Sequence, residues 1–170
     1  MNEKIEERKR TTWQVRPTLD FPELDPEVLQ YAVFEADPIG EFRELLSNSR
    51  ARFAKELAAT KGPSQRELLK RVQITTTWDS LFRSTPGDQV YLLIPSRSNN
   101  DPARLTKSVV SSNAVQGQRW LTTRVATLGD TPICWCIPFE ASTGKSADIE
   151  IRQENLFDLQ QEYQQRIEGY

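Results

Sequence analysis

The stretch that decides the fold is residues 119–151, which read RWLTTRVATLGDTPICWCIPFEASTGKSADIEI. Its first two thirds are runs of apolar and β-branched side chains of strand length, separated by Gly129-Asp130, a pair typical of turns. After a second turn, apolar and charged residues alternate, as in a strand with one buried face. The stretch therefore predicts three strands of an antiparallel meander, at residues 119–128, 133–139 and 147–151.

Helical patterns precede and follow these strands. Asp37-Pro38 is a helix start signal, and apolar residues then recur every three or four positions until Gly62-Pro63. Ser64 and Glu67 have the spacing of a capping box, which predicts a second long helix over 65–84. A short helix is expected after Asp25-Pro26, reaching Tyr31, and another after Asn155. In the second of these, the spacing predicts an inward apolar side, Leu156, Leu159, Tyr163 and Ile167, and a solvent-facing side, Glu154, Asp158, Glu162 and Arg166.

The middle of the chain is less regular. Residues 89–94 form an apolar run of strand length, and a polar loop is expected over 96–102. Residues 104–114 give no clear pattern, and a short helix is one interpretation. The predicted fold class is α+β: an N-terminal extended strap and helices packed on a small, mainly antiparallel sheet, with a C-terminal helix. Residues 25–170 are expected to form a single domain.

Residues 1–24 are predicted to be a charged arm followed by an extended strap. The arm, residues 1–12, is rich in Glu, Lys and Arg. In the strap, large apolar side chains are interleaved with Pro17 and Pro22, and proline favours extended backbone. Its apolar side chains need a surface, either this protein's own core or another chain. If the surface is another chain, Trp13 and Phe21 are the expected anchors.

Composition narrows the possible chemistry. The 170 residues include no histidine, which excludes Ser-His-Asp and Cys-His catalysis and zinc sites built on imidazole. The net charge of −2 gives no overall bias towards nucleic acid. The N-terminus lacks the apolar segment of a signal peptide, and no run is long enough to span a membrane. We therefore expect a cytoplasmic protein without membrane, metal or cofactor.

Three motifs deserve a chemical interpretation. Gly144-Lys145-Ser146 resembles the end of a phosphate-binding loop, but position 139 is Phe139 rather than the required glycine, which favours a simple turn. Cys134 and Cys136 lie on one face of a predicted strand, which favours a core position over a thiol or soft-metal site. Asp148 and Glu150, with Asp130 upstream, have the composition of a magnesium site, but a solvent-facing strand side explains them and is the favoured interpretation.

Basic residues gather in the middle of the sequence. Arg97, Arg104, Lys107, Arg119 and Arg124 lie near Tyr91 and Trp120. Arginine together with exposed aromatic rings can bind single-stranded nucleic acid through phosphate contacts and stacking.

The function predicted from the sequence is a non-catalytic interaction or assembly protein, an adaptor or accessory factor, whose partner is another protein chain. The alternative is a nucleic-acid-binding accessory protein that uses the central arginines. A third hypothesis is a small enzyme with a carboxylate–magnesium centre or a reactive Cys136. No catalytic residue is assigned.

Overall fold

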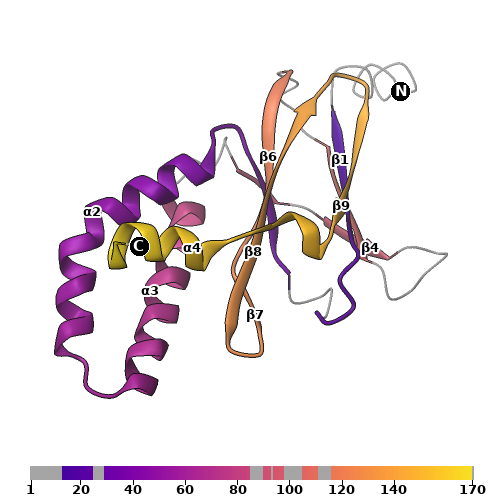
Figure 1. The fold of residues 1–170 in the computed structure, drawn as a ribbon. Coiled ribbons are helices and arrows are strands. Elements are labelled where there is room, and N and C mark those ends of the chain that lie inside the picture. The colour runs from indigo at the N-terminus through magenta and orange to yellow at the C-terminus, as the bar shows by residue number, and fades with distance from the viewer. Residues whose placement is uncertain are drawn as a thin grey trace.

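The computed structural model describes residues 13–24, 29–84, 90–92, 94–97, 105–110 and 116–169, and it confirms the α+β fold (Figure 1). The charged arm at 1–12, the helix start at 25–28, the turn at 86–88 and Arg104 lie outside these residues. The strands are β1 (Gln14–Leu19), β2 (Tyr31–Phe34), β3 (Val90–Leu92), β4 (Ile94–Arg97), β5 (Leu105–Val110), β6 (Gly117–Thr123), β7 (Ala126–Leu128), β8 (Thr131–Ala141), β9 (Ser146–Ile151) and β10 (Leu156–Phe157). The helices are α2 (Pro38–Ala59), α3 (Pro63–Ser84) and α4 (Leu159–Tyr163), with a 3-10 turn η2 (Gln153–Asn155) and a π-helical turn η3 (Gln164–Glu168).

The strands form two sheets rather than the single sheet predicted. One has four strands in the order β4-β5-β1-β9, and the other has six, in the order β10-β8-β6-β2-β3 with β7 beside β8. The predicted antiparallel pairing of residues 119–128 with the following strand is correct, because β6 and β7 each pair antiparallel with β8. The single strand predicted there is wrong, since residues 124–125 separate β6 from β7. The predicted meander is also wrong for β9, which pairs in parallel with β1 in the other sheet. The chain passes from the six-stranded to the four-stranded sheet in the turn before β9. There the backbone oxygen of Lys145 accepts a hydrogen bond from the backbone N–H of Gln14 at 3.0 Å.

The two sheets and the helices form three layers with two cores (Figure 1). Side chains alternate along β8, so Ile133 and Trp135 face the four-stranded sheet while Cys134 and Cys136 face the helices. The same alternation places Val33 and Phe34 of β2 in different cores. The six-stranded sheet is therefore buried on both faces, which explains the unbroken burial of β2 and of residues 132–136 in β8.

The predicted strap is β1, an interior strand. It pairs with β5 on one side and β9 on the other. Trp13 and Phe21 are 1% and 5% exposed and pack in the core between the sheets, Trp13 against the ring of Phe139 and Phe21 against that of Trp135. These apolar side chains therefore lie on the protein's own core, and residue 24 does not mark an architectural boundary.

The helix start signals were partly correct. Asp37 caps α2 as predicted, with its carboxylate accepting from the N–H of Ile39 at 2.9 Å. The second long helix begins at Pro63, so Ser64 lies inside it and forms no capping box. Proline is favoured at this first helical position because a backbone N–H there would have no acceptor within the helix, so its absence costs no hydrogen bond. Gly62, with φ of 89°, makes the turn before it.

The C-terminal helix begins later than predicted. Asn155 shapes the turn after β9, donating to Glu150 O and accepting from Arg152 N, both at 2.8 Å. Leu156 then belongs to β10, and Asp158 caps α4 by accepting from Gln161 N at 3.0 Å. Glu162 was expected in solvent but is 9% exposed.

The irregular middle of the chain is also strand. Tyr31 belongs to β2, so the short helix expected to reach it does not. The run at 89–94 contributes to two strands, β3 and β4, which lie in different sheets. Residues 96 and 97 of the expected loop belong to β4, and residues 105–110, where a short helix was one interpretation, are β5. Pairing with distant strands decides these segments, which explains why local pattern did not.

We expect Trp13→Ala to destabilise the protein by about 3–5 kcal/mol, because it empties a fully buried indole site between the two sheets. Urea unfolding followed by far-UV circular dichroism measures the change. The control is Arg16→Ala on the exposed side of the same strand, expected to change stability by less than about 0.5 kcal/mol. Equal stability of the two variants would contradict the core role of Trp13.

Candidate docking surface

The α2–α3 hairpin is the largest helical feature, and it is anchored to the sheet at one end (Figure 1). Trp78 of α3 packs edge-on against Phe42 of α2, with ring centroids 5.0 Å apart, and its indole N–H donates to Thr123 O at 2.8 Å. Asp79 accepts from Val125 N at 3.2 Å, and burial raises the pKa of its carboxyl. The rest of the hairpin extends away from this base to the turn at Gly62.

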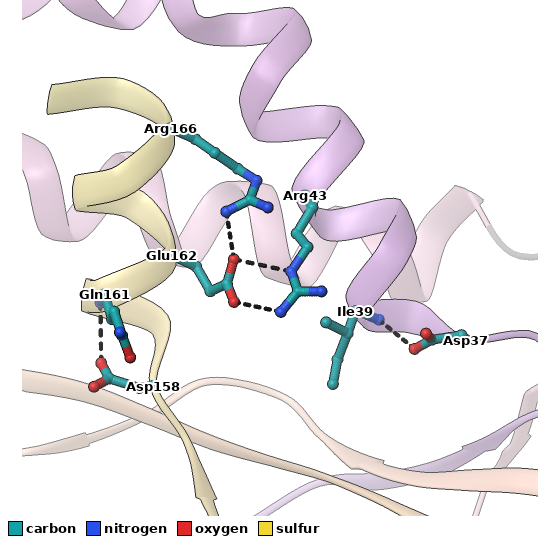
Figure 2. Close-up of polar contacts among 7 residues, drawn as sticks. All are labelled: Asp37, Ile39, Arg43, Asp158, Gln161, Glu162 and Arg166. Atoms are coloured by element: carbon teal, nitrogen blue, oxygen red, sulfur yellow. Dashed lines mark hydrogen bonds and ion pairs between the residues drawn. The ribbon is translucent and has the colours of Figure 1, made fainter. Parts of the chain in front are cut away.

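One face of the hairpin is covered by α4 and η3. Glu162 of α4 forms a two-point ion pair with Arg43 of α2, at 2.7 and 3.0 Å, and a second pair with Arg166 at 2.6 Å (Figure 2). The hydrogen bond from Arg43 to Glu162 is the main reason that the pKa of Arg43 is raised. Lys70 of α3 pairs with Glu168 at 2.6 Å. Acidic side chains of the C-terminal segment thus bind basic side chains of both helices.

A chain of polar contacts centred on the buried Gln73 crosses the hairpin. Tyr163 of α4 donates to the side-chain oxygen of Gln73 at 2.5 Å, and the Gln73 amide donates to Glu56 of α2 at 2.9 Å. Gln73 is itself 3% exposed. Because a buried amide is costly to leave unpaired, this chain fixes the spacing of the three helices.

The opposite face of the hairpin is open. A groove of about 340 Å³ between the helices is lined by Leu45 and Phe53 of α2 and by Leu69 and Val72 of α3. Polar side chains complete its lining: Ser49, Arg52, Glu56, Gln73, Thr76, Thr77 and Ser80. Leu68 and Val72 are 49% and 51% exposed and are the large hydrophobic side chains exposed in the described part of the chain. They lie four residues apart, and so on one side of α3. The candidate docking surface is defined as Leu45, Leu68, Leu69 and Val72, the exposed or half-buried apolar side chains at this groove, whereas Phe53 is itself buried.

The end of the hairpin far from the sheet is basic. Residues 50–71 contain seven Lys or Arg against two Glu, although the whole chain has a net charge of −2. Lys70 and Arg71 form ion pairs with other described residues, whereas five of these cations have no carboxylate among the described residues within pairing distance. The five are Arg50, Arg52, Lys55, Lys61 and Arg66.

The two thiols are core residues. Cys134 and Cys136 are both buried and free, and they pack in the core beneath the helices. Burial raises the pKa of both thiols, that of Cys136 to about 12. A thiol with a raised pKa in an apolar setting is a poor nucleophile, so this environment gives Cys136 no catalytic activation.

The acidic residues considered for magnesium do not assemble. Asp148 and Glu150 lie on the exposed side of β9, while Ile149 and Ile151 between and after them are buried. Asp130 lies at the β7–β8 turn and pairs with Arg71 of α3 at 3.2 Å. Within the described residues, no three Cys, Asp or Glu side chains form a group that could hold a metal ion.

The Gly144-Lys145-Ser146 motif is a turn, as predicted. Lys145 N donates to Ser142 O at 3.0 Å, Gly144 has φ of 76°, and a strand follows. A phosphate-binding loop would lead into a helix instead.

The central arginines are divided between the sheets. Arg97 and Lys107 belong to β4 and β5 of the four-stranded sheet, whereas Arg119 lies in β6 of the six-stranded sheet. Arg119 is 6% exposed and lies 3.9 Å from Glu35. Arg124 lies over the ring of Phe82, 5.1 Å from its centroid. The two whose side chains the structure describes, Arg119 and Arg124, thus each lie against a group of this chain's own fold.

Comparison with known protein families, curated proteins and solved structures found no match to this chain. A search of the described residues also found no helix long and apolar enough to cross a membrane. Inference about function therefore starts from the geometry of the chain itself.

The candidate docking surface was missed at the level of sequence. Leu68, Leu69 and Val72 fitted the apolar stripe of the predicted helix, and such stripes normally face a core. Two signals could have identified the hairpin: the excess of basic residues over 50–71, and the two divergent apolar sides of the α3 sequence, Leu68/Val72 and Ile74/Trp78/Leu81.

We expect both cysteines to resist alkylation in the native protein at pH 8, because the thiolate is the reactive form and burial keeps the thiols protonated. Mass spectrometry after iodoacetamide treatment should show no added group, and two after unfolding in guanidinium. Rapid native modification of Cys136 would contradict the structure.

We expect Glu162→Ala to release α4 from the hairpin, because it leaves Arg43 and Arg166 without their shared carboxylate. The free energy of unfolding should fall by about 1–3 kcal/mol. Hydrogen exchange should accelerate in residues 159–168, while the exposed control Glu154→Ala should leave exchange there unchanged. Unaltered exchange in Glu162→Ala would show that these ion pairs do not hold the segment.

Proposed function

We propose that this protein is an interaction or assembly protein that docks another protein chain on the open face of its α2–α3 hairpin. The observation that supports the proposal most directly is the exposure of Leu68 and Val72 beside the groove between α2 and α3. Burying one such side chain contributes about 1.5–3 kcal/mol, so a partner that covers both gains appreciable affinity. Leu68 and Val72 take the anchoring role that the sequence suggested for Trp13 and Phe21. Those two side chains are buried in this protein's own core and so are not exposed to a partner.

A helix is the kind of segment that fits this surface. The groove lies between two helices and is lined by Leu45, Phe53, Leu69 and Val72, a spacing that accepts apolar side chains repeating every three or four residues. The protein already docks one such segment on the other face, where Leu159, Tyr163 and Ile167 of α4 and η3 are buried. The hairpin therefore has the shape and chemistry of a helix-binding element.

The proposal includes a reducing compartment such as the cytoplasm. Cys134 and Cys136 are both free thiols, which is typical of proteins that fold where disulfides do not persist.

The test is site-specific photo-crosslinking. A photoreactive benzophenone residue at position 72, in cells that express the protein, should give a discrete protein adduct on illumination, because position 72 lies at the interface. The same residue at position 148, exposed on β9, is the matched control and should give no such adduct. Adding Leu68→Glu to the position-72 probe should abolish the adduct.

Two outcomes would overturn this function. An adduct of equal yield at positions 72 and 148 would show random collision rather than docking. An adduct that disappears on nuclease treatment would instead show that the basic end of the hairpin binds nucleic acid.

A further inference from the structure

A second cavity, of about 810 Å³, lies at the end of the hairpin far from the sheet. Four segments line it: the end of α2, the turn at 60–62, the start of α3 and the end of η3. Helical periodicity places its residues Ala54 and Ala58 on the opposite side of α2 from Arg52 and Glu56, which line the groove. The cavity and the candidate docking surface are therefore separate sites.

Small and apolar side chains shape this cavity. Its apolar lining residues are Ala54, Leu57, Ala58, Pro63 and Ile167. The turn between the helices is held by Thr60, whose hydroxyl donates to Glu56 O at 2.8 Å and whose N–H donates to Leu57 O at 3.1 Å. Because cavities of roughly 300–1,000 Å³ are typical of small-molecule sites, this one has room for a ligand with an apolar part.

The charged side chains of the cavity favour an anion. They are Lys61, Glu67, Arg66, Lys70 and Glu168. Lys70 pairs with both carboxylates, with Glu67 at 3.2 Å and with Glu168 at 2.6 Å. Lys61 and Arg66 are exposed, and no carboxylate of the described residues lies within pairing distance of either. The acidic groups here thus have a cation already, whereas two cations have no anion.

We propose that this cavity binds a small organic phosphate, with its phosphate group between Lys61 and Arg66 and its organic part against Ala54 and Ala58. A phosphomonoester carries about 1.5–2 negative charges and three acceptor oxygens, so it can accept from both cations at once. The guanidinium of Arg66 suits this role because two of its N–H groups match two phosphate oxygens. The inference is independent of the docking function, and it gives a role to basic residues that docking leaves unexplained.

Titration of the ¹⁵N-labelled full chain with phenyl phosphate tests the site by NMR. We expect saturable chemical-shift changes in the amides of residues 60–62 and 64–67, which surround the cavity. The amides of β9 are the internal control and should not shift. A wild-type protein that shows no saturable change at about 10 mM phenyl phosphate overturns the inference.

Charge reversal tests which cations hold the phosphate. Lys61→Glu with Arg66→Glu should weaken binding at least about tenfold, because the phosphate then faces two carboxylates. The matched control is Arg52→Glu with Lys55→Glu, which makes the same change of charge at side chains that do not line the cavity. At 0.15 M salt this control should weaken binding less than about threefold, because solvent screens the more distant charges.

The four substituted side chains are all exposed, so both double variants should keep the circular dichroism spectrum of the wild type. An equal loss of affinity in the two folded variants would show attraction by the overall charge of the hairpin, and it would overturn a site at Lys61 and Arg66.

Two further ligands test the rest of the assignment. Phenyl phosphate should bind at least about fivefold more tightly than inorganic phosphate, because its ring covers the apolar wall. Equal affinities would overturn the organic part of the ligand. An alanine-flanked phosphoserine peptide that binds at least about tenfold more tightly than phenyl phosphate would place the phosphate on a protein and overturn the small-molecule ligand. None of these results alters the crosslink expected at position 72, so the two proposals fail separately.

Discussion

Burial of the six-stranded sheet on both faces is the constraint on which the rest of the structure depends. Its strand β8 presents Ile133 and Trp135 to one core and Cys134 and Cys136 to the other. A sheet that is apolar on both sides needs two covering layers, because either face left in water would expose a large apolar area. The four-stranded sheet provides one layer, with β1 at its interior, and the helices provide the other.

The helical layer covers the sheet with only part of its length. Phe42, Trp78 and Phe157 fill the junction, where Trp78 and Phe157 stack with ring centroids 5.3 Å apart. Beyond this junction the hairpin is held by α4 and η3, through Glu162 and the chain from Tyr163 through Gln73 to Glu56. Arg71 adds an ion pair to Asp130 in the β7–β8 turn. The segment formed by α4 and η3 can cover one side of two helices but not both. The open face is thus the side of the hairpin that neither α4 nor η3 covers.

Function was less predictable than fold, for a physical reason. The sequence suggested Trp13 and Phe21 as anchors because large apolar side chains beside prolines need a surface. It could not tell that β5 and β9 provide that surface, since strand pairing joins residues far apart in the chain. Leu68 and Val72 present the reverse case. Their spacing is that of a buried stripe, and only the three-dimensional positions of α2 and α4 show that nothing described covers them.

Local sequence pattern was enough to predict the α+β class, the long helix capped by Asp37, the strands β6 and β8 and the inward position of Cys134 and Cys136. Each of these depends on local periodicity or on a cap within a few residues, which the chain encodes directly. Tertiary structure alone decided the division into two sheets, the parallel pairing of β9 with β1, the burial of Glu162 and the separation of Arg119 from Arg97. These depend on contacts between residues many positions apart, and neither periodicity nor charge pattern specifies which distant segments meet.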